Sequence, residues 1–205
     1  MKLSDTLLGK LGIGLNEATL VGLEVDPSTR TAAVSLTVFS LPEEGPPPDD
    51  PTIQFLLLPV GRVVASLRLG RWDDLDAVIV PVALEDLSDV VSSFNQQPIY
   101  GWQFFDRQEV ELPKIGNRVS MDWRSGEGGA THSLFLFQEG NERHIDLIIW
   151  FDDMTIRDPE GRVVSIDAFA AAGKRWWDGL YAGDPRTKGC GIVPLKDDRQ
   201  KPKAE

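Results

Sequence analysis

The sequence predicts an α+β fold: a mainly antiparallel twisted sheet or half-barrel built from consecutive hairpins, with a central helix and a C-terminal helix packed on it. Short segments with apolar residues at every second position, typical of half-buried strands, alternate with turn-forming runs of Asp, Asn, Gly and Pro. Two other segments have apolar residues at three- and four-residue steps, as amphipathic helices do. A chain of 205 residues with 41% hydrophobic composition can bury roughly 70% of its unfolded surface in one core. We therefore expect a single globular domain over residues 1–194.

The first forty residues predict a short helix followed by a hairpin. Ser4 can cap a helix, but three glycines within residues 9–14 limit it to about two turns. Residues 21–25 then enter the turn at 26–29 and return as residues 32–38, apolar at every second position.

The next segment contains a proline-rich loop and several strands. Residues 41–52 carry prolines and like charges that can join no ladder, so we expect a proline-rich acidic surface loop, with a role as a proline-rich ligand left open. The apolar run 53–58 is typical of a strand covered on both faces. Residues 60–69 fit helical and strand spacing alike, and their β-branched content favours a strand. Residues 77–82 predict another buried strand.

The second half of the chain predicts a helix over 84–94, strands over 99–105 and 118–123, and a hairpin that joins 131–137 to 144–151.

The last strong element is a helix over residues 166–182. Ser165 is placed to cap its start and Gly183 to end it. The charged tail 195–205 has no apolar anchor, and we expect it to be disordered.

Charge and composition limit the classes of partner and the compartment that we expect. The formal net charge is −11, which repels phosphate backbones and anionic membranes, so we expect neither nucleic acid nor a membrane as a partner. Cys190, the single cysteine, allows no internal disulfide, and we interpret it as an incidental thiol. Residues 1–15 do not have the pattern of a signal peptide, and no run of about 18 apolar residues occurs. We expect a cytoplasmic protein.

A symmetric turn at residues 139–142 predicts where the two histidines lie relative to each other. Phe137 then lies opposite His144, and Ile149 lies opposite His132. The imidazoles fall on opposite faces, five residues and about 17 Å apart at 3.3 Å per residue, so they cannot share a metal.

One face of this hairpin is predicted to be core, and it carries Leu134, Leu136, Ile145, Leu147 and Ile149. The other face combines Phe135, Phe137, Ile148 and Trp150 with His144 and Asp146. It is either covered or open to a ligand. His144 and Asp146 are neighbours there and could form an imidazole–carboxylate pair, for which a structural role is the alternative to catalysis.

Carboxylates gather in two places, but neither set has the spacing of a calcium loop or a histidine nearby in sequence. We interpret them as turn and cap residues and expect no metal and no cofactor. The clusters are Asp73, Asp74 and Asp76, and Asp152, Asp153 and Asp158.

Six tryptophans are present, and most are expected in the core. Trp176 and Trp177 point about 100° apart on a helix, so only one of them can face the core. With Trp176 inward, Trp177 and Tyr181 align on the helix flank and could form a partner surface. Trp150 and Phe137 are the other candidate binding residues.

No nucleophile elbow, phosphate loop, dinucleotide fingerprint or zinc-protease motif occurs. The leading hypothesis is a non-enzymatic binding or protein-interaction module with a protein partner or self-association. One alternative is a hydrolase-like enzyme that uses His144 and Asp146 with a carboxylate from Asp152 or Asp153. The other is a sugar- or lipid-binding barrel, and a small ligand is compatible with either alternative.

Overall fold

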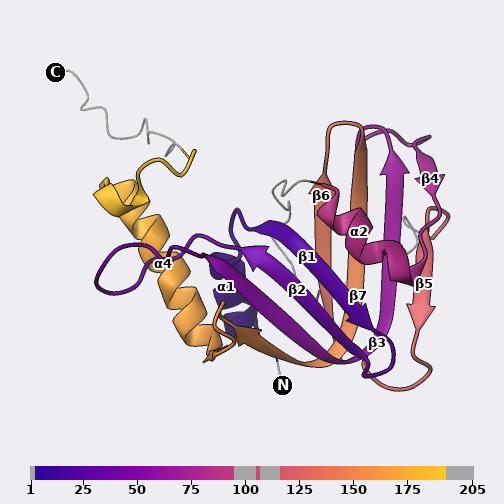
Figure 1. The fold of residues 1–205 in the computed structure, drawn as a ribbon, viewed down its shortest axis with the longest axis horizontal. Coiled ribbons are helices and arrows are strands. Elements are labelled where there is room, and N and C mark those ends of the chain that lie inside the picture. Colours follow the sequence, from indigo (N-terminus) through magenta and orange to yellow (C-terminus); the bar gives the residue numbers. More distant parts are fainter. Residues whose placement is uncertain (1–2, 95–104, 107–115, 193–205) are drawn as a thin grey trace.

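A twisted, unclosed sheet of eight mostly antiparallel strands organises the computed structural model, which describes residues 3–94, 105–106 and 116–192 (Figure 1). Three α-helices occur in the described part of the chain. The α+β fold with hairpins and a C-terminal helix is therefore confirmed.

The helices are α1 (Asp5–Gly14), α2 (Leu87–Ser92) and α4 (Ile166–Ala182), with short 3-10 helices η1 (Leu84–Asp86) and η2 (Pro185–Thr187). The strands are β1 (Thr19–Asp26), β2 (Thr31–Thr37), β3 (Thr52–Leu69), β4 (Val78–Val80), β5 (Met121–Arg124), β6 (His132–Glu139), β7 (Arg143–Arg157) and β8 (Val163–Val164).

Strand β3 is the central strand of the sheet. It pairs with β7 along one edge, and its other edge pairs with β2, then β5, then β4. The region 60–69, which fitted both helix and strand, is strand throughout. Both of its faces are covered, since Val63 and Ala65 join the main core while Val64 and Ser66 are buried on the other face. This two-sided burial explains why the sequence showed no clean alternation there.

The sheet is strongly twisted (Figure 1), and apolar side chains of α1, α2 and α4 join one core with those of the sheet. Although β1 and β6 are the two ends of the strand order, Gln138 of β6 donates a hydrogen bond to the carbonyl of Leu20 in β1 (3.4 Å). Helix α2 packs on β1, and α1 packs against α4. Phe55 and Phe169, from β3 and α4, meet edge to face within this core.

The crossing of α1 and α4 depends on glycine. A Cβ on Gly173 would lie 2.9 Å from the Cα of Gly14, and a Cβ on Gly14 would overlap the Phe169 ring. Helix α1 runs for ten residues, longer than the predicted two turns, and its last residue, Gly14, is the one that lies against α4. The ends of α4 are as predicted: Ser165 accepts a hydrogen bond from the Ala168 amide, and Gly183 is left-handed.

The register of the β6–β7 hairpin differs from the prediction by two residues. His144 lies opposite Glu139, and His132 lies opposite Phe151, because the Gly140 amide bonds to the Arg143 carbonyl and makes the turn tighter and off-centre. A shift of two keeps every side chain on its predicted face. The two histidines remain on opposite faces, seven residues apart along β7.

Other predictions are corrected or fall outside the described residues. Strand β4 is a three-residue strand with Val78 largely exposed, not a buried strand over 77–82, because it only borders the end of β3. The helix expected over 84–94 begins as a 3-10 turn and is α-helical over 87–92. The strand over 99–105 lies outside the described residues except at Phe105, which bridges to Leu134. The tail 195–205 also lies outside them.

Candidate functional site

Hydrogen bonds hold the loop between β3 and β4 in place. Gly70, at a φ of +113°, turns the chain and donates its amide to the Glu142 carbonyl (2.7 Å). Within the loop the Asp74 amide donates to the Arg71 carbonyl (3.1 Å), and the Asp74 carboxylate accepts the Asp76 amide (2.9 Å). The loop therefore presents its side chains from a defined backbone.

Four large apolar side chains are exposed on this hairpin end: Leu69 (47%), Trp72 (57%), Leu75 (74%) and Val78 (63%). We call them the tip patch. Leu69 and Val78 form a directly opposed cross-strand pair, and the other two residues lie in the loop beyond it. The described part of the chain contains eight exposed large hydrophobic residues, and half of them fall within these ten positions. Such clustering is typical of an interaction surface rather than of scattered surface residues.

The loop that carries the tip patch has a net negative charge. The loop carries three aspartates, Asp73, Asp74 and Asp76, and one cation, Arg71, all of them exposed. Arg71 lies 3.1 Å from Asp73, which leaves two carboxylates in excess. Apolar side chains with an acidic border are suited to a partner that is apolar at its centre and cationic at its rim.

A buried polar cluster lies directly behind the tip, on the outer face of β3 and β7. It consists of Ser66, Arg68, His144 and Asp146, all buried. Arg68 forms an ion pair with Asp146, and the Ser66 hydroxyl donates to the Arg118 carbonyl. His144 uses Nδ1 as the donor to the Gly70 carbonyl (3.1 Å), so the cluster fixes the residue at which the tip begins.

The environment of His144 favours the neutral imidazole. Burial lowers the pKa of His144 below its usual value, and the charges of Arg68 and Arg118 lower it further, against the opposing effect of the Gly70 bond and of Asp74. With Nδ1 as the donor, the neutral ring has its lone pair on Nε2. Among the described residues, Nε2 has no hydrogen-bond partner.

The predicted pair His144 and Asp146 lies on one face, as expected, but each side chain has another partner: His144 bonds to the Gly70 carbonyl just after β3, and Asp146 pairs with Arg68 of β3. The carboxylate of Asp152, proposed to assist them, is eight residues further along β7, or about 26 Å at 3.3 Å per residue. It accepts the Thr131 hydroxyl (2.6 Å) and the amides of Gly129, Ala130 and Thr131 (2.9–3.0 Å), and these bonds, the hydroxyl first, lower the pKa of Asp152 to about 2. Asp152 thus holds the backbone of residues 129–131 and lies far from His144.

His132 faces the apolar side of the sheet and lies 3.0 Å through Nδ1 from the Asp106 carboxylate. Asp106 also accepts the Ser133 amide (3.1 Å). Asp106 was not among the candidate residues, because a carboxylate 26 positions away cannot be paired with a histidine from sequence spacing alone.

The four predicted binding residues fall into two pairs on different elements. Phe137 and Trp150 are half-buried on the outer face of the β6–β7 hairpin, where the Arg62 guanidinium lies 4.9 Å from the centre of the Trp150 ring. Trp177 is half-buried against Trp176, while Tyr181 is 67% exposed on α4. In Figure 1 helix α4 and the turn of that hairpin lie toward opposite ends of the molecule.

Trp72 and Leu75 were not predicted as binding residues, although the sequence contains a usable signal. Both lie inside a turn-forming run, Gly70-Arg71-Trp72-Asp73-Asp74-Leu75-Asp76, where side chains seldom reach a core. The turn role predicted for Asp74 is confirmed by its bond to the Asp76 amide.

Among the described residues, no group of three or more His, Cys, Asp or Glu side chains is placed to hold a metal ion. None of the helices in that part of the chain has the length and apolar character needed to cross a membrane. No protein-family model matches the chain, and comparison with curated proteins and with solved structures finds no significant match.

Proposed function

We propose that this protein is a non-enzymatic interaction module that docks a positively charged protein partner through the tip patch. The observation that carries the proposal is the exposure of Leu69, Trp72, Leu75 and Val78 on one ordered hairpin end. Tryptophan is enriched among residues that dominate binding energy, because one rigid side chain removes a large apolar area from water.

Charge decides between the possible occupants. The tip loop has two carboxylates in excess, and the whole chain has a net charge of −11. A second copy, a nucleic acid or an anionic membrane would each bring more negative charge to this loop, which disfavours association. A partner with an apolar cleft bordered by lysine or arginine meets both the side chains and the charge of the tip.

The central test compares partner capture by the wild-type chain with capture by a Trp72→Ala/Leu75→Ala double variant. The matched control is Val163→Ala, which truncates a similarly exposed apolar side chain on β8. A captured protein is purified, and its direct affinity for each variant is measured. We expect the double variant to bind roughly 30-fold more weakly or worse, equivalent to about 2 kcal/mol, and the control to bind as wild type.

A charge variant tests the partner's chemistry separately. Asp73→Asn/Asp74→Asn/Asp76→Asn keeps the side-chain oxygen that accepts the Asp76 amide but removes three negative charges. We expect slower association and a weaker dependence of the association rate on salt, with a smaller change in dissociation. Full affinity in the Trp72/Leu75 variant would contradict the docking site, whereas a charge variant that associates as fast as wild type would contradict the cationic partner only.

A further inference from the structure

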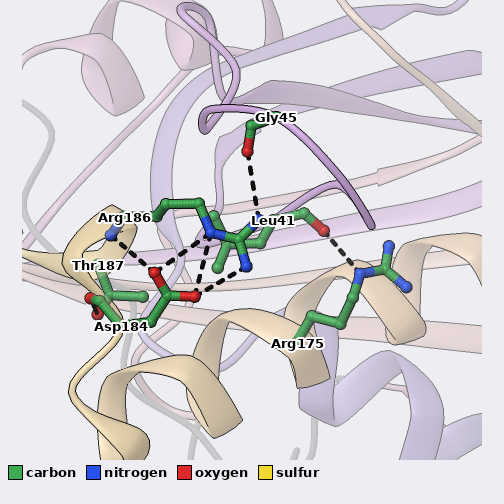
Figure 2. A network of polar contacts seen from close by, with 6 residues as sticks. All are labelled: Leu41, Gly45, Arg175, Asp184, Arg186 and Thr187. Atoms are coloured by element: carbon green, nitrogen blue, oxygen red, sulfur yellow. Dashed lines mark hydrogen bonds and ion pairs between the residues drawn. The ribbon is translucent and has the colours of Figure 1, made fainter.

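The segment that joins β2 to β3 is the longest connection in the described chain without helix or strand, yet it is firmly attached. The backbone of Leu41 is bonded to α4 twice: its amide donates to the Ala172 carbonyl (3.1 Å), and its carbonyl accepts a bond from the Arg175 side chain through Nε (3.0 Å). Arg186 donates to the Gly45 carbonyl (3.2 Å), and Figure 2 shows both arginines reaching the segment from the helical side. The two ends of the segment are joined by a bond from the Val38 amide to the Pro51 carbonyl (3.2 Å).

Side-chain packing strengthens this attachment. Leu41 is fully buried in a second apolar cluster with Trp176 and Leu180, separate from the main core. Phe39 stacks on Trp176 with ring centres 4.2 Å apart. Arg186 is itself held by the Asp184 carboxylate at 2.8–3.2 Å, so its bond to Gly45 comes from a fixed side chain (Figure 2).

Between these anchors the chain presents three consecutive prolines, Pro46-Pro47-Pro48, all exposed. The ring of each proline fixes φ near −65°, and a following proline moves the residue before it out of the helical region. Pro46 and Pro47 are therefore restricted to extended conformations of the polyproline II type. Such a segment loses little conformational entropy when a groove binds it, and here the attachment to α4 has already removed part of the freedom of the flanking chain.

Exposed carboxylates border the prolines on both sides. Glu43 and Glu44 precede them, and Asp49 and Asp50 follow them. Asp50 accepts the Thr52 amide (2.9 Å), which fixes the loop end and, together with the Thr52 hydroxyl, lowers the pKa of this carboxyl group. The segment is therefore an exposed proline run that is restricted by its own rings and bordered by negative charge.

We propose that Pro46-Pro47-Pro48 is a docking ligand for an aromatic-lined, polyproline-binding groove with a cationic rim on a partner protein. The aromatic groove is the common feature of domains that recognise this conformation. The cationic rim follows from the carboxylates that flank the prolines, of which Glu44, Asp49 and Asp50 lie beside the run and Glu43 lies 3.8 Å from Arg175. This surface lies on a different segment from the tip patch, and the inference does not depend on the proposed function.

The experiment uses the full chain, isotope-labelled, and a panel of purified SH3, WW and EVH1 domains chosen for lysine or arginine beside the groove. Binding is measured by amide chemical-shift changes and by calorimetry. We expect at least one domain to bind at micromolar to millimolar concentration, with shifts confined to residues 42–51. Pro46→Ala/Pro47→Ala/Pro48→Ala should weaken that binding roughly tenfold or more.

Two variants control the result. Pro159→Ala removes another exposed proline between acidic neighbours, in the turn after β7, and should leave the affinity unchanged. Trp72→Ala/Leu75→Ala should also leave it unchanged, which separates this surface from the tip patch. Arg186→Ala, which releases Gly45 without touching the prolines, should weaken binding a few-fold through lost preorganisation.

The absence of binding by every domain in the panel would overturn the proposal. So would binding that survives the triple proline substitution, since the contact would then lie elsewhere. Amide spectra of the triple variant outside residues 42–51 report whether the fold is intact, and because all three prolines are exposed we expect those spectra to match the wild type.

Discussion

Arg68 and Leu69 are neighbours at the end of β3, and the structure buries the arginine while it exposes the leucine. Arg68 is 9% exposed and paired with Asp146, whereas Leu69 is 47% exposed beside Val78. Ordinary residue preferences would place the two the other way round. The difference marks the boundary between a polar layer that holds the hairpin in place and the apolar tip that the hairpin presents.

The two sides of this boundary have different energetic roles. A buried ion pair adds little net stability over apolar residues, but removing one partner leaves an uncompensated buried charge. An exposed leucine adds almost nothing to folding, and its apolar area remains available for a partner. The same strand thus separates the residues that support the structure from the residues available for binding.

The largest expected effect is that of Arg68→Ala, which should lower the free energy of unfolding by about 3–5 kcal/mol because the buried Asp146 carboxylate loses its ion pair with the Arg68 guanidinium. Leu69→Ala should change the same quantity by less than about 0.5 kcal/mol. Urea unfolding of both variants measures the contrast. Equal losses would remove the distinction between support and binding residues.

Helix α4 offers the same contrast between adjacent residues. Trp176 is 4% exposed and stacked on Phe39, so Trp176→Ala should cost roughly 3–5 kcal/mol. Trp177 is only half-buried, and Trp177→Ala should cost clearly less and weaken self-association or partner capture, if the flank formed with Tyr181 is a surface. Thermal melts and light scattering on the two variants compare them. A larger loss for Trp177→Ala, with association unchanged, would contradict both the helix phase and that surface.

The two faces of β7 offer a third contrast, because Leu147 lies on the face opposite His144 and Asp146. Leu147 is buried between Ala65 and Leu136 in the ladder, and Leu147→Ala should cost about 2–5 kcal/mol. Chemical denaturation checks the value. A loss of less than roughly 0.5 kcal/mol would mean that Leu147 and Asp146 had been assigned to the wrong faces.

These variants also separate what the sequence could predict from what it could not. The faces of Leu147 and His144 follow from local alternation, which survives even a register error of two residues. The ends of α4 follow from Ser165 and Gly183, whose capping chemistry is local. Local patterns were therefore sufficient for the sidedness of the β6–β7 hairpin and for the caps of the longest helix, but not for the burial of β4.

The features that were missed depend on contacts between distant segments. The turn bond from Gly140 to Arg143 sets the register and has no sequence signature of its own. Asp146 is buried in an ion pair with Arg68, which is 78 residues away. From the sequence we could predict the kind of site, an interaction surface, but not its position. The candidate position at Trp72 follows from the fold, in which Trp72 and Leu75 of the β3–β4 loop are exposed.

The smallest expected effect concerns pH and the link between the polar cluster and the tip. The pKa of His144 is lowered in the folded protein, chiefly by burial, relative to about 6.5 in an unfolded chain. As pH falls through that range the unfolded chain takes up a proton before the folded protein does. The stability that neutral His144 provides is therefore fully present above about pH 6.5 and is lost progressively below it, by at most about 1.4 kcal/mol per pH unit.

His144→Asn isolates this contribution, because the asparagine amide can still donate to the Gly70 carbonyl but cannot titrate. The charged groups around the ring remain the same in both proteins: Arg68 on β3, Arg118 before β5, Asp74 in the tip loop, Asp146 on the same face and Glu139 opposite. Urea unfolding from pH 7.5 to 5 should show wild type losing more stability than the variant. The titration of Asp26 and Asp152, whose pKa values are about 2, lies below this window. Parallel curves would mean that protonated His144 is tolerated behind the tip, and the buried cluster would then hold Gly70 equally well in either charge state.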